Sequence, residues 1–340
     1  MRPTTASVTV IVPGLNVISM IVRCLQAIKA SDYPVREILF FDDGSSDGSG
    51  AAAAREGARV LRNDGRPVGP AAGRNRAAAQ AQGDLLLFVD SDVVIRPDTI
   101  GLLVGALDDG AVAAFGSYDD NPPAPNLASR YANLRHHFVH QKGAGDMSTF
   151  WAGIGVIRKD IFLAIGGFSG RYTRPSIEDI ELGARLVAQG YRIRLEPRAM
   201  GTHLKGWSLL RLWRTDIFAR AIPWARLIAA GATKGADLNG TMRERLTAIV
   251  AHLLLLGLAL APFWHWGVAL ALVALVLFLA AIGPFALLLA RKLPAWKLPG
   301  AIGLHWLYYL YASQILGWTL VARRLAGKRA PGQASRVSAR

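Results

Sequence analysis

The chain is poor in cysteine and in acidic residues. Cys24 is its one cysteine in 340 residues, which excludes an internal disulfide and a multi-cysteine zinc or iron–sulfur site. Asp and Glu number 24 against 39 Lys and Arg, giving a formal net charge of +15. This surplus indicates an acidic partner: nucleic acid, anionic lipid or a nucleotide diphosphate. Since 52% of the residues are hydrophobic, a wholly disordered chain is excluded.

Charged residues are missing from long stretches of the C-terminal third. Residues 266–290 contain none and, at about 1.5 Å rise per residue, are long enough to cross a bilayer. Residues 248–263 are nearly as apolar, and residues 301–322 combine an absence of charge with aromatic side chains typical of membrane interfaces. We therefore predict a membrane region at residues 246–325. Its first two apolar segments are predicted to span the membrane, and residues 301–322 are a candidate third span. Buried core helices are the alternative.

Basic residues beside these segments set the predicted topology. The positive-inside bias places residues 1–245 in the cytoplasm, as part of a multi-pass protein of the plasma (inner) membrane. The predicted disordered tail at residues 326–340 is also basic, which conflicts with a third crossing. The third segment either crosses against the bias, lies in the interface or re-enters. The basic residues that flank the first two spans are Arg243, Arg245, Arg291, Lys292 and Lys297.

A different pattern fills residues 204–245. Apolar residues recur there at steps of three and four, with basic residues between them, which predicts amphipathic helices and a linker on an anionic membrane. A solvated helix packed on the N-terminal domain is the alternative. Because much of the basic excess lies beside apolar segments, lipid headgroups explain it and we expect no nucleic-acid partner.

Residues 1–203 read as an α/β domain. Short apolar runs at residues 8–12, 38–41 and 85–89 lack alternation, as expected of strands buried on both faces. Alanine-rich helical stretches separate them. This order predicts a Rossmann-like, mostly parallel sheet with flanking helices.

Acidic residues follow two of the predicted strands. Asp42 and Asp43 come directly after one strand, and Asp90 and Asp92 after another. Ligands of open α/β sheets bind beyond the carboxyl ends of the strands, so both pairs should face one crevice. Carboxylate oxygens suit Mg²⁺ or Mn²⁺ bridging to substrate phosphates. The alternative is that these acids only form turns or helix caps.

Taken in order, the motifs resemble the family 2 glycosyltransferases with a GT-A fold. The resemblance covers about residues 6–205. Its first half runs from residues 8–13 and Asn16 through Asp42-Asp43-Gly44-Ser45 and Arg74-Asn75 to Asp90-Ser91-Asp92. Its second half is formed by residues 150–153, by Gly166-Gly167-Phe168 and by Glu178-Asp179.

The resemblance implies a donor site for a nucleotide sugar. In such enzymes Pro13, Asn16, Asp42 and Asp43 would cradle the base and ribose. Arg74 would reach the nucleotide, and Asp90 would help to hold the nucleotide sugar. Asp92 would ligate Mg²⁺ or Mn²⁺ on the diphosphate, and His203 would be a diphosphate or metal contact.

The resemblance also implies a catalytic base in the Glu178-Asp179 motif, which here is Asp179. A carboxylate that takes the proton of an acceptor hydroxyl makes it a nucleophile, and one base without a covalent intermediate would invert the anomeric centre. Residues 176–179 equally resemble a helix capping box. Capping and catalysis are compatible.

The implied function is a membrane-associated inverting glycosyltransferase acting on a lipid, a lipid-linked or another hydroxyl or phosphate acceptor. A processive polysaccharide synthase is one alternative, although the Gln-x-x-Arg-Trp signature of such enzymes is missing. A non-enzymatic membrane adaptor that binds nucleotide sugars is the other. The sequence also departs from the family at Val17, where an acid often follows the asparagine.

Overall fold

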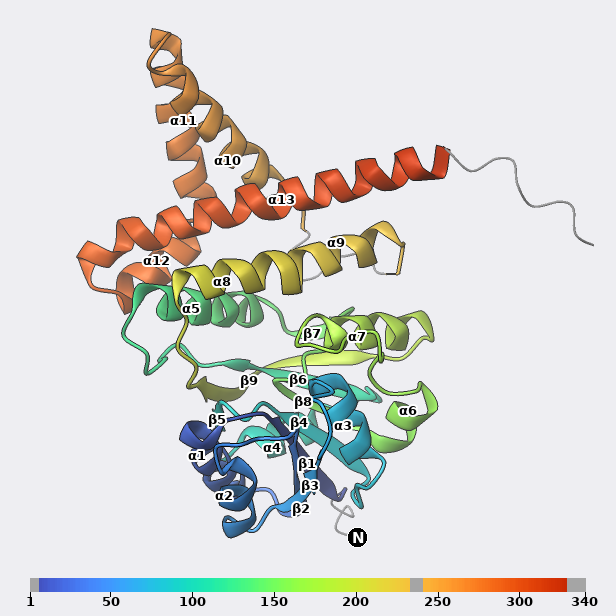
Figure 1. The fold of residues 1–340 in the computed structure, drawn as a ribbon. Helices are drawn as coiled ribbons and strands as arrows, with labels where there is room; N and C mark the ends of the chain where they lie inside the picture. The colour runs from blue at the N-terminus through green and yellow to red at the C-terminus, as the bar shows by residue number, and fades with distance from the viewer. Residues whose placement is uncertain (1–5, 233–240, 329–340) are drawn as a thin grey trace, which may run out of the picture.

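Figure 1 shows the computed structural model of the protein, which describes residues 6–232 and 241–328. An α/β domain built from the N-terminal part lies at one end of the molecule, and layers of helices from the C-terminal part cover it. Of the predicted basic tail, residues 329–340 lie outside the described residues.

The first four pairing strands form the parallel half of the sheet, in the order β3-β2-β1-β4. Helices α1 (Ile18–Lys29), α2 (Ser49–Arg55) and α3 (Pro70–Ala78) connect them, as the apolar runs predict. The carboxyl ends of β2 and β4 therefore lie at the same edge, where both acidic pairs follow. The strands are β1 (Val8–Gly14), β2 (Val35–Asp42), β3 (Arg59–Arg62) and β4 (Leu85–Val89).

The other half of the sheet is mixed, so the expectation of a mostly parallel sheet is wrong beyond β4. Among the described residues the sheet continues β4-β8-β6-β9-β5, with β7 also paired to β9. Only β6 and β9 are parallel there; the remaining pairs are antiparallel. A strand buried on both faces shows the same apolar run in either direction, so hydropathy did not reveal the reversal. These strands are β5 (Val93–Ile95), β6 (Ala113–Tyr118), β7 (Gly145–Met147), β8 (Ile154–Arg158) and β9 (Ile193–His203).

Two apolar cores sandwich the sheet because strand side chains alternate between its faces. Val10 and Val12 of β1 pack into one core with α1, whereas Ile11 packs into the other with Phe88 and Phe150. The second core lies under α6 (Lys159–Ala164) and α7 (Glu178–Ala188); α4 (Thr99–Gly105) covers the first. This packing holds the strand ends that carry the acids in a rigid frame.

The predicted amphipathic segment is one continuous helical stretch between the domain and the C-terminal helices (Figure 1). It consists of α8 (Leu209–Arg214), a π-helical turn (Thr215–Ala221) and α9 (Ile222–Ala229). Leu212 packs in one cluster with Tyr131 of α5 (Leu127–Lys142) and Phe285 of α12 (Gly283–Lys292). The segment is therefore packed against protein on both sides, while Leu210 and Phe218 remain exposed.

The C-terminal third begins with the helical hairpin of α10 (Met242–Leu260) and α11 (His265–Ala281), which projects away from the domain in Figure 1. Helix α12 (Gly283–Lys292) and a short 3₁₀ turn (Ala295–Lys297) lead to α13 (Leu298–Lys328). Helix α13 runs alongside the α8–α9 segment and crosses the base of the hairpin, where Trp306 Nε1 donates to the carbonyl oxygen of Ala251 on α10.

Within the described ranges, none of the helices is by itself both long enough and apolar enough to cross a bilayer. Helices α11 and α12 meet this requirement only when taken together, across a bend of 74°. Residues 266–290, predicted as one span, are divided between these two helices. Pro284 has no backbone N–H and its ring clashes with the preceding turn, so α11 ends at Ala281 and a new helix starts at Gly283. The other two predicted segments fall within α10 and α13.

Candidate active site

One large cavity, of about 1670 Å³, brings together acids from distant parts of the chain. Asp43 follows β2, Asp92 follows β4 and Asp179 lies in the first turn of α7, and all three line it. Pro13, Arg74, Asp90, Glu178 and His203 line the same cavity. The shared crevice expected from the two acidic strand ends is therefore present.

Asp43 organises the loop between β3 and α3. Its carboxylate accepts hydrogen bonds from Asn63 Nδ2 at 2.9 Å, from the Val68 amide at 2.9 Å and from the Gly69 amide at 2.8 Å. Gly69 has φ +85°, and a Cβ there would lie 2.4 Å from the carbonyl oxygen of Thr173. The loop thus closes against the segment that precedes α7, on the cavity wall.

Asn16 and Asp42 are not among the cavity-lining residues. Asn16 has φ +55°, a left-handed conformation that asparagine tolerates, and its Oδ1 accepts a hydrogen bond from the Ser46 amide at 3.0 Å. Asp42 Oδ1 accepts from the Ser45 amide at 2.8 Å. Both residues brace the turn after β2, which shapes the site behind Asp43.

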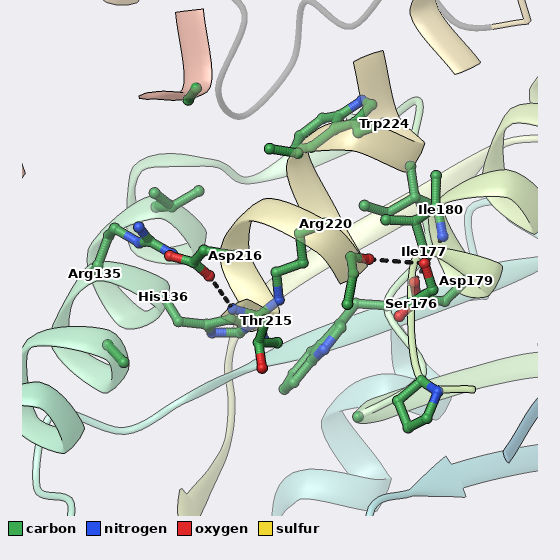
Figure 2. Close-up of a pocket in the computed structure, with 18 of the residues that line it drawn as sticks. Arg135, His136, Ser176, Ile177, Asp179, Ile180, Thr215, Asp216, Arg220 and Trp224 are labelled. Atoms are coloured by element: carbon green, nitrogen blue, oxygen red, sulfur yellow. Dashed lines mark hydrogen bonds and ion pairs between the residues drawn. The ribbon is translucent and has the colours of Figure 1, made fainter. Parts of the chain in front are cut away.

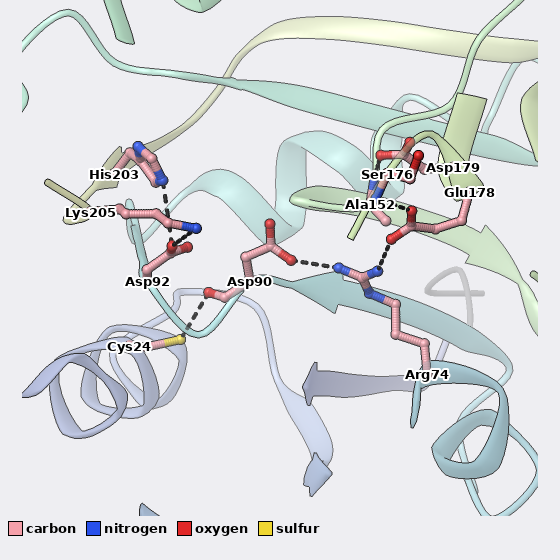
Figure 3. Close-up of polar contacts among 10 residues, drawn as sticks. All are labelled: Cys24, Arg74, Asp90, Asp92, Ala152, Ser176, Glu178, Asp179, His203 and Lys205. Atoms are coloured by element: carbon pink, nitrogen blue, oxygen red, sulfur yellow. Dashed lines mark hydrogen bonds and ion pairs between the residues drawn. The ribbon is translucent and has the colours of Figure 1, made fainter. Parts of the chain in front are cut away.

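Asp90 and Asp92 stand in different electrostatic surroundings (Figure 3). Burial raises the pKa of Asp90, although Arg74 acts in the opposite direction. Burial also acts to raise the pKa of Asp92, but the hydrogen bond and charge of His203 and the charge of Lys205 bring this pKa below its ordinary value. His203 Nε2 lies 3.5 Å and Lys205 Nζ 3.9 Å from Asp92 Oδ2. Asp92 is thus the carboxylate more readily ionised.

The donor set near Asp92 fits a divalent ion shared with substrate, and not one held by protein alone. Among residues 6–232 and 241–328 no three His, Cys, Asp or Glu side chains are grouped as metal ligands. Asp92 offers the two oxygens of its carboxylate, and His203 offers an imidazole nitrogen that lies 3.5 Å from Asp92 Oδ2. Mg²⁺ sites commonly use one or two carboxylates, with phosphate and water completing the shell. The residues present match that pattern.

Arg74 is buried between two carboxylates instead of facing the cavity freely. Its Nη2 donates to Asp90 Oδ1 at 2.5 Å and its Nη1 to Glu178 Oε1 at 3.3 Å, and its side chain is 5% exposed (Figure 3). The guanidinium lies 5.6 Å from the ring centroid of Phe168. Arg74 therefore ties the turn after β4 to the start of α7.

Asp179 is positioned by two backbone amides. Its Oδ2 accepts from the Ala152 amide at 3.1 Å, and its Oδ1 accepts from its neighbour Ile180 at 2.8 Å. Burial and then the adjacent charge of Glu178 raise the pKa of Asp179 to about 7. A carboxylate with a pKa near neutrality is suited to accept a proton at physiological pH. Glu178 Oε2 meanwhile accepts from the Ser176 amide at 2.8 Å.

Cys24 is an inert member of this region. Its Sγ lies 3.6 Å from the carbonyl oxygen of Asp90, and burial raises the pKa of the thiol. A buried thiol of this kind is not a nucleophile.

A second polar group on the cavity wall escaped the sequence analysis (Figure 2). Asp216, in the π-helical turn, accepts from Arg135 Nη2 at 2.8 Å, from Arg220 Nη1 at 2.9 Å and from the Tyr311 hydroxyl at 2.9 Å. The sequence assigned Arg220 to a membrane-facing stripe because basic residues alternate with tryptophans there. The acid at position 216, four residues before Arg220, was the available signal for this pairing.

The loop that precedes α7 and Asp179 is linked to this second group. The Ser176 hydroxyl donates to the carbonyl oxygen of Ala219 at 2.8 Å. Ala219 precedes Arg220, so the π-helical turn and the start of α7 share one wall of the cavity (Figure 2). Lys205 was also missed; it follows His203 by two residues and lies on the same side of the extended chain.

Comparison with known proteins places these motifs in a family. The profile of glycosyl transferase family 2 matches residues 9–166, and that of the galactosyltransferase N-terminal domain matches residues 133–205. Glycosyltransferase AglE of Haloferax volcanii is 34% identical over 217 residues, which are 60% of this chain and 68% of that protein. The chain belongs to glycosyl transferase family 2.

Two further similarities show how far the family assignment extends. The pre-mycofactocin glycosyltransferase of Mycobacterium tuberculosis is 28% identical over 59% of this family 2 chain, which spans only 43% of the length of that relative. A solved structure of the mannosyltransferase PcManGT from Pyrobaculum calidifontis in complex with GDP-Man and Mn²⁺ superposes with a TM-score of 0.54 at 19% identity. The superposition covers 96% of this chain and 88% of the PcManGT chain, so the two proteins share the GT-A fold.

Proposed function

We propose that this family 2 protein is a membrane-associated inverting glycosyltransferase that uses a nucleotide-diphosphate sugar and a divalent ion. The observation that carries the proposal is the single cavity lined by Asp43, Asp92 and Asp179. Relatives support it: the PcManGT complex holds GDP-Man and Mn²⁺, and a TarS structure from S. aureus holds UDP-GlcNAc.

In the proposed reaction, Asp179 takes the proton of the acceptor hydroxyl as its oxygen attacks the anomeric carbon. The bond from that carbon to the diphosphate breaks, and its electron pair leaves with the nucleoside diphosphate. A single displacement inverts the anomeric centre. The raised pKa of Asp179 and its two amide hydrogen bonds supply a base that is both strong enough and fixed in place.

The donor would bind at the carboxyl ends of β1, β2 and β4. Pro13 and the loop held by Asp43 would border the base and ribose, with Asn16 and Asp42 bracing the turn behind. Asp92 and His203 would hold Mg²⁺ or Mn²⁺, which when bound neutralises charge on the leaving diphosphate. Arg74 would act by fixing Asp90 and Glu178, because its guanidinium is already engaged with both.

We also propose that the C-terminal helices attach the protein to the plasma membrane, with the α/β domain on the cytoplasmic side and a lipid or lipid-linked acceptor. Exposed apolar side chains on α10 and α11 support this, as do the basic residues beside the helices. The cavity itself supports the acceptor class, because it reaches from Asp179 to Leu256 of α10 and Leu320 of α13.

The test combines donor binding with catalysis in the detergent-purified full chain. Nucleotide sugars are screened for thermal stabilisation with and without Mn²⁺; we expect at least one to stabilise the protein only with the metal. Asp179→Asn should then lower the transfer rate about 10²- to 10⁴-fold while leaving donor stabilisation intact. Glu181→Gln is the matched control, because Glu181 lies on α7 and pairs with Arg185 instead.

Two outcomes would refute the proposal. One is the absence of stabilisation by any nucleotide sugar with Mg²⁺ or Mn²⁺. The other is transfer by Asp179→Asn at the rate of the Glu181→Gln control. The anomeric configuration of the product, determined by NMR, tests inversion separately.

A further inference from the structure

The cavity that contains the acids continues as an apolar groove between α9, α10 and α13. Side chains one helical turn apart line it on two helices, so each helix presents a continuous face. The helix α10 face includes Ile249, Leu253 and Leu256, whose exposed fractions are 58%, 39% and 48%. The facing residues of α13 are Ala312, Leu316 and Leu320.

These groove faces are long apolar surfaces that the described protein leaves open. Gly317 of α13 lines the groove, and a Cβ at this position would meet no atom within 4 Å. Exposed apolar surface of this kind, joined to a polar site, is typical of a surface that binds a hydrocarbon ligand.

A positive charge stands where the groove meets the acidic site. Two guanidinium groups, of Arg135 and Arg220, share the one buried carboxylate of Asp216, so the group carries a net charge of about +1. Both line the cavity, but the side chain of Arg135 is 13% exposed and that of Arg220 is 46% exposed. Trp224 lies beside it in Figure 2, and its buried Nε1 has no hydrogen-bond partner among the described residues.

We propose that the groove binds the hydrocarbon chain of an amphiphilic acceptor and that Arg220 contacts the phosphate that joins this chain to the reacting end. The order of chemistry along the cavity carries this inference: apolar groove, cation, then base. A guanidinium binds phosphate oxygens in a bidentate manner. This inference rests on the proposed function, since it names the acceptor class for the same site.

The hydrogen bond from Ser176 to Ala219 relates the positions of Arg220 and Asp179. Because the turn that carries Arg220 is bonded to the loop just before α7, a phosphate held by Arg220 presents its neighbouring atoms to the base. A neutral amphiphile would lack this anchor. A short alkyl phosphate would lack the contacts of the groove.

The first experiment maps binding directly in the full chain. Hexadecyl phosphate with a photoreactive diazirine at the chain end is added to the detergent-purified protein, and cross-linked peptides are identified by mass spectrometry. We expect labels on the groove faces of α10 and α13, suppressed by unlabelled hexadecyl phosphate and not by butyl phosphate. Labels distributed equally over the outer face of α11 would overturn the inference, because they would report non-specific contact with apolar surface.

The second experiment tests the chain groove and the phosphate contact separately. Gly317→Trp places a side chain in the open groove, and should weaken hexadecyl phosphate binding at least about tenfold. Its matched control is Gly303→Trp, since Gly303 lies on the same helix with equally open space but does not line the cavity. Equal binding by the two variants would contradict a chain in the groove.

Arg220→Gln should weaken hexadecyl phosphate at least about tenfold and change hexadecanol binding little. Arg226→Gln, on the same helical stretch but outside the cavity lining, is the control. Equal losses for the phosphate and the alcohol would overturn the assigned phosphate contact.

Donor stabilisation with Mn²⁺ is measured on every variant. A failure of the proposed function would appear as absent donor stabilisation in the parent chain. A failure of this inference alone would appear as normal donor stabilisation with acceptor binding that is insensitive to both positions.

Discussion

The two ends of the cavity are built by different physical means. At the donor end, charged side chains are buried and engage one another: Arg74 with Asp90 and Glu178, and Asp43 with three donors of its loop. At the helical end, the apolar side chains that line the cavity are exposed, up to 58% for Ile249 of α10. The first end therefore depends on directional contacts within the protein, and the second carries surface that a partner would cover.

This difference predicts where the molecule tolerates change. A buried charge that loses its partner cannot be resolvated, whereas an exposed apolar side chain has little to lose within the chain itself. Substitutions at the donor end should therefore act on folding and catalysis together. Those at the helical end should act on binding alone.

The largest expected effect on stability comes from Arg74→Met. It leaves Asp90 and Glu178 buried without their cation, which should lower the apparent free energy of unfolding by about 3–5 kcal/mol in thermal or denaturant unfolding of the full chain. Arg158→Met is the control, because its pair with Asp160 is exposed and worth under about 1 kcal/mol. Equal stabilities for the two variants would contradict the claim that the donor end depends on buried, paired charges.

A smaller effect is expected from pH. Asp179 must be deprotonated to act as a base and its pKa is raised to about 7, so the transfer rate should fall about tenfold per pH unit below 7 and level off above it. Vesicle binding should not follow this profile, because arginine keeps its charge throughout. Asp179 should change from mostly protonated to mostly ionised between roughly pH 5.5 and 8. A transfer rate that stays constant over this range would argue against Asp179 as the base.

The smallest effect on stability is expected from Phe263→Ser, at the turn of the hairpin. The side chain is 87% exposed, so unfolding should change by less than about 0.5 kcal/mol. Flotation with anionic vesicles should nevertheless show roughly fivefold weaker binding, since a membrane would bury part of the ring. Leu163→Ser on α6, exposed but within the α/β domain, should change neither quantity; a matching loss there would show that the hairpin has no special role.

Much of the donor end could be predicted from the sequence because its motifs stand at strand ends. Asp43, Asp92 and Asp179 line one cavity, as expected, and the parallel order of β1 to β4 follows from the apolar runs. The antiparallel second half of the sheet could not be predicted, because a doubly buried strand looks alike in either direction. Asn16 and Asp42, predicted to cradle the base and ribose, brace the turn after β2 and do not line the cavity; a motif shows which residues gather and not which of them face the cavity.

At the helical end, hydropathy located the apolar segments but not their directions. It joined α11 and α12 into one span, although Pro284 bends the chain there by 74°. It also assigned Arg220 to a lipid-facing stripe, whereas Arg220 pairs with Asp216 four residues earlier, and Asp216 is held by Arg135 and Tyr311 as well. Hydropathy does not report such contacts between residues distant in the chain.

The sequence by itself determined which chemical groups the protein carries: the paired acids after buried strands, the Glu-Asp motif, and the uncharged C-terminal segments. These are local properties, readable from residue type and spacing. Only the tertiary structure decided that Arg74 is locked between two carboxylates, that the Asp179 pKa is raised, and that one cavity joins acids to an apolar groove. Those properties depend on burial and on contacts between residues distant in the chain, and packing alone creates them.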